Sequence, residues 1–232
     1  MWQPIKGIYT YHEIQKSKWI IIFVHWLTSD QNEETFVQWE KFFNENWYST
    51  IRFNLYWDLP GERKLDEACL KDNIDDVNGV LDFCNAKWYK KIFLVGHSYG
   101  WIVNLYVNHD NISWILMRDS SIWWKQLLND VYLDENWKYY IDRWDWYRHY
   151  IGKKLYQDFQ ISSEEFLQKI SEINVPIKII WAEKWLWETA KQYYEYANEP
   201  KELKIISCAD HRFLDWGMSE LLEESQEWLN KL

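Results

Sequence analysis

The 232-residue chain is poor in glycine, cysteine and long apolar runs. Its seven glycines fall well short of the ~16 that an average content of about 7% would supply. Its three cysteines, Cys69, Cys84 and Cys208, are odd in number and widely spaced. This pattern argues against a disulfide framework and a cysteine metal site, and it predicts reduced thiols. The longest apolar run, Trp19–Trp26, is far shorter than the ~20 residues of a membrane-spanning helix.

The charge and the first residues of the chain limit the partners and the location that we expect for the protein. The formal net charge is −10, which argues against nucleic acids and anionic membranes as partners, because both reward clustered lysine and arginine. The first residues, MWQPIKGIYTYHE, lack the apolar region of a signal peptide, so we expect a cytoplasmic protein. With 47% hydrophobic and 27% charged residues, the chain has enough apolar side chains for a packed core.

Apolar strands alternate with helical patterns along the chain. The continuous apolar run at Lys18–His25 predicts a strand that is buried on both faces. Further strands are expected at Ser49–Tyr56, Lys91–Gly96, Ile112–Met117, Ile177–Trp181 and Leu203–Ile206. Helical spacing is found at Glu33–Asn46, Lys64–Asn85, Trp101–Val107 and Ser219–Leu232. This alternation predicts an α/β fold with a mainly parallel sheet flanked by helices.

Residues 120–174 interrupt this alternation. They are rich in aromatic and charged side chains, and they include a helical pattern at Ser163–Ile173. The chain has neither an internal repeat nor a low-complexity linker that would divide it into domains. We therefore expect a single domain over residues 1–232, with residues 120–174 as a cap or lid inserted between strands of the sheet.

A serine stands just after the predicted strand Lys91–Gly96, within Gly96-His97-Ser98-Tyr99-Gly100. This G-x-S-x-G pattern between a strand and a helix predicts a turn so tight that the serine adopts strained backbone geometry, with its hydroxyl exposed above the sheet. Small residues are needed on both sides because the strand and the helix pass very close. The N-terminal dipole of that helix also favours developing negative charge. The motif makes Ser98 a candidate nucleophile.

With this motif the chain resembles the α/β-hydrolase family, and more narrowly its serine aminopeptidase-like and acyl-ester hydrolase branch. The resemblance covers nearly the whole chain, including Phe23–Ser29 after the first long strand and Cys208–Phe213 after the last. It implies that Ser98 attacks an acyl carbonyl and that His211 accepts its proton. It also implies an oxyanion hole formed by the backbone N–H groups of two residues, Tyr99 and Leu27.

The acid of the implied triad stays open among three carboxylates. The family places an aspartate after the strand Ile177–Ile180, but the aligned residue here is Trp185. Glu183 and Glu188 lie near that position, while Asp119 follows an earlier strand at another location that the fold can use. Each keeps the chain order of serine, acid and histidine. Each is equally consistent with a solvated charge.

The resemblance implies a serine hydrolase that cleaves a carboxylic ester, with an amide or N-terminal peptide bond less favoured. It implies no metal or organic cofactor, and the expected partner is a small-molecule acyl ester. An apolar or aromatic substrate is favoured by tyrosines within residues 120–174, namely Tyr132, Tyr139, Tyr140, Tyr147 and Tyr150. The alternative is a non-catalytic binding protein that retains the fold, because Trp185 occupies the acid position.

Tryptophan is as abundant as glycine is scarce, with 19 in the chain. Trp47 and Trp88 each follow a predicted helix, at the position where a left-handed residue, usually glycine, ends a helix. Trp137 follows Asn136 where Asn-Gly would form a turn. Trp19 opens a strand. By the resemblance, three further tryptophans stand where the family has glycine, namely Trp26, Trp57 and Trp101.

Two hypotheses explain these seven tryptophans. In the first, the protein is rich in aromatic residues and has a wide hydrophobic site. In the second, their codons mean glycine in the source organism, as UGA does in some bacterial lineages, whereas another common code reads it as tryptophan. If about 12 of the 19 tryptophans were glycine, the seven glycines would rise to about 19, near the usual content of about 7%.

Overall fold

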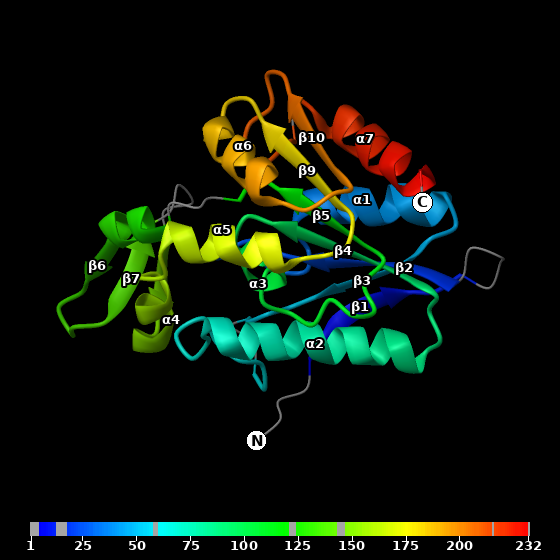
Figure 1. Cartoon of the computed structure of the whole chain (residues 1–232). Coiled ribbons are helices and arrows are strands. Elements are labelled where there is room, and N and C mark those ends of the chain that lie inside the picture. The colour runs from blue at the N-terminus through cyan, green and yellow to red at the C-terminus, as the bar shows by residue number, and fades with distance from the viewer. Residues whose placement is uncertain are drawn as a thin grey trace.

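The computed structural model describes residues 5–12, 18–57, 60–120, 124–142, 147–214 and 216–231. Its centre is a seven-stranded sheet in the order β1-β3-β2-β4-β5-β9-β10 (Figure 1). The strands are β1 (Gly7–Thr10), β2 (Trp19–Val24), β3 (Ser49–Phe53), β4 (Lys91–His97), β5 (Trp114–Arg118), β9 (Ile177–Ala182) and β10 (Lys201–Ile206). Neighbouring strands are parallel except for β1 and β3. The predicted α/β fold with a mainly parallel sheet is confirmed.

Helices cover both faces of this sheet (Figure 1). Those that pack against it are α1 (Glu34–Glu45), α2 (Leu70–Ala86), α3 (Tyr99–Asn104), α5 (Ser163–Glu172), α6 (Trp187–Tyr196) and α7 (Met218–Asn230). One face contacts α1 and α7 through large side chains such as Phe36 and Trp228. The opposite face contacts α2, α3, α5 and α6. Both faces are therefore buried, which explains the continuous apolar runs of the central strands.

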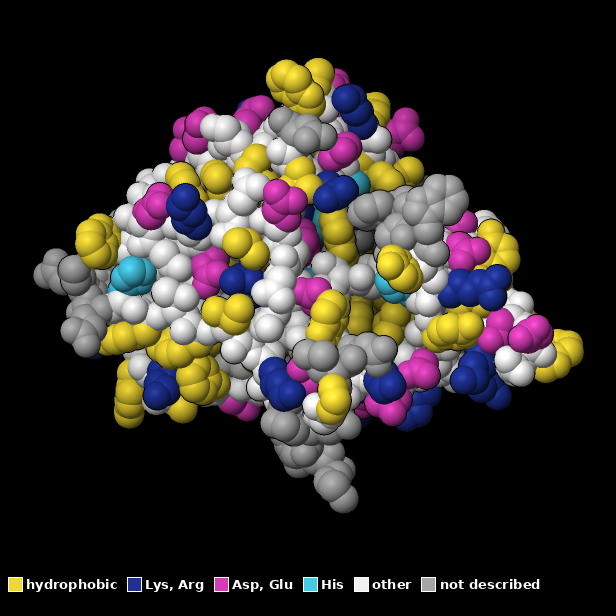
Figure 2. Space-filling model, turned by 180° about the vertical axis from the view of Figure 1, so that it is seen from behind, with side chains coloured by type: hydrophobic (Ala, Val, Ile, Leu, Met, Phe, Trp, Pro, Cys, Tyr) yellow, Lys and Arg dark blue, Asp and Glu magenta, His cyan; other side chains and the backbone are white. Residues whose placement is uncertain are grey.

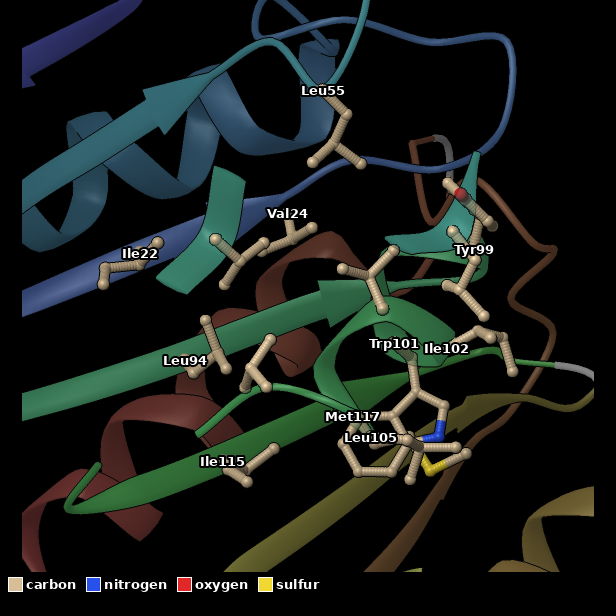
Figure 3. Close-up of a cluster of buried hydrophobic side chains, with 14 of the residues drawn as sticks. Ile22, Val24, Leu55, Leu94, Tyr99, Trp101, Ile102, Leu105, Ile115 and Met117 are labelled. Carbon is tan, nitrogen blue, oxygen red and sulfur yellow. The ribbon is translucent and has the colours of Figure 1, made fainter. Parts of the chain in front are cut away.

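Residues along the central strands alternate between the two faces, because side chains of a strand have a period of two. In β4, Ile92 and Leu94 join the core that includes α3, whereas Phe93 and Val95 join the core that includes α1. Figure 3 shows Leu94 beside residues of β2, β5 and α3. The strand that leads to Ser98 is thus held firmly from both sides.

The segment between β5 and β9 forms a second, smaller unit at one side of the sheet (Figure 1). It contains a three-stranded antiparallel sheet in the order β6-β7-β8, together with three helical elements. Its parts are the 3₁₀ helix η2 (Trp124–Asp130), β6 (Val131–Leu133), β7 (Tyr139–Asp142), β8 (Arg148–Ile151), α4 (Lys153–Asp158) and α5. This segment lies within residues 120–174, and its action as a cap stays a prediction.

The sequence patterns do not predict every element of the main sheet and its helices. They contain no signal for β1, whose residues are mostly exposed at the sheet edge. They also miss α6, which buries only Thr189, Ala190 and Tyr193. Helix α2 begins at Leu70 rather than at Lys64, because residues 64–69 form turns. Short or weakly apolar elements lack the periodicity on which such predictions depend.

Three of the seven tryptophans at expected glycine sites have left-handed backbone. Their φ angles are 69° at Trp47, 62° at Trp88 and 60° at Trp137. After α1, the N–H of Trp47 donates to the carbonyl of Asn44, and the N–H of Tyr48 donates to that of Phe43. The equivalent two hydrogen bonds follow α2, where Trp88 N–H donates to the Asn85 carbonyl and Tyr89 N–H donates to that of Cys84. This pattern is the Schellman motif, and its left-handed position normally holds glycine.

The other four of these tryptophans do not have positive φ. Trp19 opens β2, and Trp101 lies fully buried in the first turns of α3. Trp26 and Trp57 follow β2 and β3 in irregular loops. For these four, backbone conformation gives no argument for glycine. The argument from left-handed geometry therefore applies to Trp47, Trp88 and Trp137.

Candidate active site

Ser98 lies in the tight turn between β4 and α3. Its φ and ψ are 53° and −111°, a combination that L-residues rarely adopt. A Cβ atom on Gly96 would lie 2.7 Å from Cα of Trp101, and one on Gly100 would lie 2.0 Å from the carbonyl oxygen of Val24. Both positions therefore require glycine. The half-buried Ser98 is fixed further because its N–H donates to the Arg118 carbonyl over 2.9 Å.

His211 lies in the loop after β10, and its ring contacts a carboxylate from another strand. Its Nδ1 atom is 3.2 Å from Oδ2 of Asp119. Its side chain is 21% exposed, so the ring is partly open to solvent. The loop turns through left-handed residues at Cys208 and Phe213, with φ angles of 62° and 56°. This conformation carries the histidine back toward the ends of β4 and β5.

Asp119 follows β5 directly and is fully buried. Its φ of 44° is also left-handed, and its Oδ1 accepts the N–H of Ala182 over 2.7 Å. The remaining oxygen is the one that faces His211. Burial raises the pKa of Asp119 well above its ordinary value, while the Ala182 N–H and the charge of Arg118 act in the opposite direction.

The three candidate carboxylates lie in different places. Asp119 is paired with His211, whereas Glu183 is exposed and accepts the backbone N–H of Cys208 over 2.9 Å. Glu188 is exposed in the first turn of α6. Trp185, at the position where the resemblance expects the acid, stacks on the His211 ring with centroids 4.2 Å apart. Of the three carboxylates, the structure thus shows Asp119 in contact with His211 Nδ1.

The two residues expected to form an oxyanion hole follow β2 and β4. Tyr99 is the first residue of α3, and Leu27 lies in the turn after β2. That turn is braced by His25, whose Nδ1–H donates to the Trp26 carbonyl over 2.8 Å and whose Nε2 accepts the Leu55 N–H over 3.0 Å. Burial lowers the pKa of His25 to about 4, so its ring is neutral near pH 7.

No cluster of histidine, cysteine, aspartate and glutamate with the arrangement of a metal site occurs among the residues that the structure describes. Within the same residues, no helix is both long and apolar enough to cross a membrane. Acidic and basic side chains are interspersed on the face shown in Figure 2.

Comparison with known proteins gives matches at the level of structure. No family model and no curated protein matches the sequence. Est1E from Butyrivibrio proteoclasticus, solved with ferulic acid bound, superposes with a TM-score of 0.81 at 15% identity, covering 98% of this chain and 94% of that one. The α/β hydrolase domain-containing protein 10 from mouse superposes with a TM-score of 0.74 at 15% identity, covering 98% of this chain and 94% of that one. The chain therefore has the α/β-hydrolase fold. A monoacylglycerol lipase from Paleococcus ferrophilus aligns at a TM-score of 0.73 and 13% identity, covering 97% of this chain and 98% of its own. The esterase domain of a Rhodothermus marinus protein gives 0.73 and 15%, with 98% of both chains covered.

In an α/β-hydrolase, the strand-to-helix turn with a strained serine is the nucleophile elbow. Ser98 has that geometry, and the chain order of Ser98, Asp119 and His211 is the order of this fold. The sequence motifs assign no role to three buried residues nearby, Glu33, His97 and Arg118. The only sequence signal would have been a charged residue at the boundary of an apolar element, namely Glu33 just before α1 and Arg118 at the end of β5. Such residues are too common to single these out.

Proposed function

We propose that the protein is a serine hydrolase that cleaves a carboxylic ester through an acyl-enzyme on Ser98. The observation that carries the proposal is the contact between His211 Nδ1 and Asp119 Oδ2, made at the same sheet edge as the strained Ser98 turn. His211 is also tied to the residue beside the nucleophile, since its backbone carbonyl accepts a hydrogen bond from the His97 ring over 3.0 Å. A strained serine alone would be weaker support.

The roles follow from the chemistry of the three groups. Asp119 accepts the Nδ1–H of His211, which leaves Nε2 as the base. His211 takes the proton of Ser98 as its oxygen attacks the ester carbonyl, and it returns that proton to the leaving alcohol. Water then attacks the acyl-enzyme with the same histidine as base, which releases the acid and restores the serine. The backbone N–H groups of Tyr99 and Leu27 would stabilise the negative charge on the carbonyl oxygen.

An ester is favoured over an amide by the structural neighbours, which include a monoacylglycerol lipase, an esterase domain and Est1E with ferulic acid bound. We propose that residues 120–174 cap the site and that their aromatic side chains favour an apolar or aromatic small-molecule ester. In this segment the Tyr139 and Tyr156 rings stack with centroids 4.2 Å apart.

We propose a cytoplasmic location, and the chemistry described requires neither a metal nor an organic cofactor.

The alternative of a non-catalytic binding protein depended on Trp185 at the acid position. Asp119 meets that objection, because it supplies a buried carboxylate at His211 from a different strand.

The proposal is tested by labelling with a fluorophosphonate probe and by hydrolysis of short-chain p-nitrophenyl esters. We expect the wild-type chain to be labelled and to hydrolyse the ester, and Ser98→Ala to do neither, because the probe reacts only with an activated serine. A Ser113→Ala variant, which changes a serine outside the site, is the control. Absence of labelling and of hydrolysis in the wild-type chain would refute the proposal.

A further inference from the structure

Three buried polar side chains lie next to the triad, and the mechanism above does not use them. They are Glu33 at the start of α1, His97 at the end of β4 and Arg118 at the end of β5. Nη2 of Arg118 donates to Glu33 Oε1 over 2.9 Å and lies 2.6 Å from His97 Nδ1. The His97 and Arg118 side chains are fully buried, and that of Glu33 is 3% exposed. Burying a charged pair is costly, so its presence here calls for a specific role.

The contacts of His97 fix its protonation. Its Nε2 lies 3.0 Å from the backbone carbonyl oxygen of His211, which can only accept, so Nε2 carries a hydrogen. Its Nδ1 lies 2.6 Å from Nη2 of Arg118, which can only donate, and 3.1 Å from Oε1 of Glu33. Nδ1 therefore accepts from Arg118, and it shares that guanidinium nitrogen with the Glu33 carboxylate. Burial and the charge of Arg118 lower the pKa of His97 well below its ordinary value, which agrees with a neutral ring. A neutral His97 of this tautomer therefore bridges the Arg118 guanidinium and the His211 backbone.

This network is joined to every member of the triad. His97 immediately precedes Ser98, and Arg118 immediately precedes Asp119. The Arg118 carbonyl accepts the N–H of Ser98, and His97 donates to the carbonyl of His211. Three segments that are far apart in the sequence are thus held together by one buried group of side chains. Trp26, one of the tryptophans at an expected glycine site, packs against both histidine rings, with centroids 4.4 Å from that of His97 and 5.5 Å from that of His211.

We propose that His97 is a positioning residue that sets the place of His211 relative to Ser98, with Arg118 and Glu33 holding its ring. The inference rests on the proposed function of the same site. A displacement of about 1 Å between nucleophile and base costs about 10²-fold in rate. His97 touches neither substrate nor reacting atoms, so its loss should lower kcat and leave KM nearly unchanged.

The test compares two amides at this position in the full-length protein. Glutamine can place a nitrogen donor where Nε2 of His97 lies, whereas asparagine reaches only as far as Nδ1. We expect His97→Asn to lower kcat for a p-nitrophenyl ester by about 10²-fold and His97→Gln to stay within about threefold of wild type. The control is His109→Asn, because His109 Nε2 makes a similar contact of 2.8 Å with the Asn104 carbonyl away from the triad.

A second measurement separates positioning from a general structural role. If His97 acts through His211, then His97→Asn should not lower the residual rate further in a His211→Ala background. Equal losses of kcat in His97→Asn and His97→Gln would overturn the inference. So would a loss in the His211→Ala background as large as the one that His97→Asn causes in the wild-type chain. So would a wild-type rate in His97→Asn. An inactive wild-type chain would instead refute the proposed function, so the two failures are distinguishable.

Discussion

Asp119 combines its contact with His211 with a cost in stability. Its carboxylate is fully buried, and burial raises its pKa well above the ordinary value. The folded state therefore binds this proton more tightly than the unfolded state does. The resulting stabilisation is present below the unfolded pKa of about 3.8 and is lost as the pH rises through the folded pKa. The ionised carboxylate therefore lowers the stability of the folded state, whatever it contributes through its contact with His211.

Replacing Asp119 with asparagine should separate these two effects. We expect Asp119→Asn to lower kcat by about 10³- to 10⁴-fold, because an amide cannot hold His211 in the required tautomer. The melting temperature of the variant relative to wild type should rise as the pH increases above about 3.8, since only the wild type carries a buried carboxyl group whose raised pKa makes ionisation costly in the folded state.

The matched control is Asp130→Asn in the 3₁₀ helix η2, which should alter neither kcat nor the pH dependence of the melting temperature. Full activity of Asp119→Asn would remove Asp119 from the triad. A relative melting temperature that falls with increasing pH would contradict the raised pKa.

At the scale of elements, three turns contain a tryptophan with left-handed backbone, a conformation that favours glycine. The left-handed conformation costs an L-residue roughly 1–2 kcal/mol. Trp88 lies in the turn after α2, and Trp137 lies in the turn from β6 to β7. Their side chains are 82% and 80% exposed, so the indoles recover little of this cost through burial.

Glycine at these turns should therefore stabilise the protein. We expect Trp88→Gly and Trp137→Gly each to raise the free energy of unfolding by up to about 1 kcal/mol, as measured by urea denaturation. Trp114→Gly is the control, because Trp114 is buried in β5 and its loss should destabilise by at least 3 kcal/mol or so. Destabilisation by Trp88→Gly and Trp137→Gly would contradict the argument.

The left-handed tryptophans also bear on the coding hypothesis. Peptide mass spectrometry of the protein from its source should find glycine at Trp47, Trp88 and Trp137 if their codons are read as glycine there. UGG codons or intact tryptophan at these positions would refute that hypothesis and leave the aromatic-rich alternative.

At the scale of the whole molecule, buried neutral histidines make the fold sensitive to acid. Burial lowers the pKa of His25, His97 and His109. For His25, the change from 6.5 to about 4 corresponds to about 3 kcal/mol. This stability is fully present above the unfolded pKa of 6.5 and is lost as the pH falls toward 4. The raised pKa of Asp119 acts in the opposite direction.

Replacing His25 should reduce this dependence on pH. Asparagine can keep the donor to the Trp26 carbonyl but does not titrate. We expect the loss of unfolding free energy between pH 7 and pH 5, measured in urea, to be smaller in His25→Asn than in wild type. His149→Asn, on β8, is the control. Equal losses in His25→Asn and wild type would show that His25 is not the group that titrates.

Much of this architecture could be predicted from local patterns. The apolar runs of β2 and β4 indicate strands buried on both faces, and alternation with helices predicts a parallel sheet. The G-x-S-x-G motif indicates Ser98 because its chemistry depends on consecutive residues. The left-handed sites at Trp47 and Trp88 are also predictable, because a helix end is a local feature.

Contacts between distant segments could not be predicted in this way. Asp119 and His211 are 92 residues apart, and only the alignment of β5, β9 and β10 decides that Asp119, rather than Glu183 or Glu188, contacts the His211 ring. The Glu33–Arg118 pair joins residues 85 apart for the same reason. The sequence by itself determined the fold class and the tight turn at Ser98, because each depends on neighbouring residues. Tertiary structure decided which carboxylate contacts His211 and which side chains form the buried network, because each depends on where separate loops meet at the carboxyl ends of the strands.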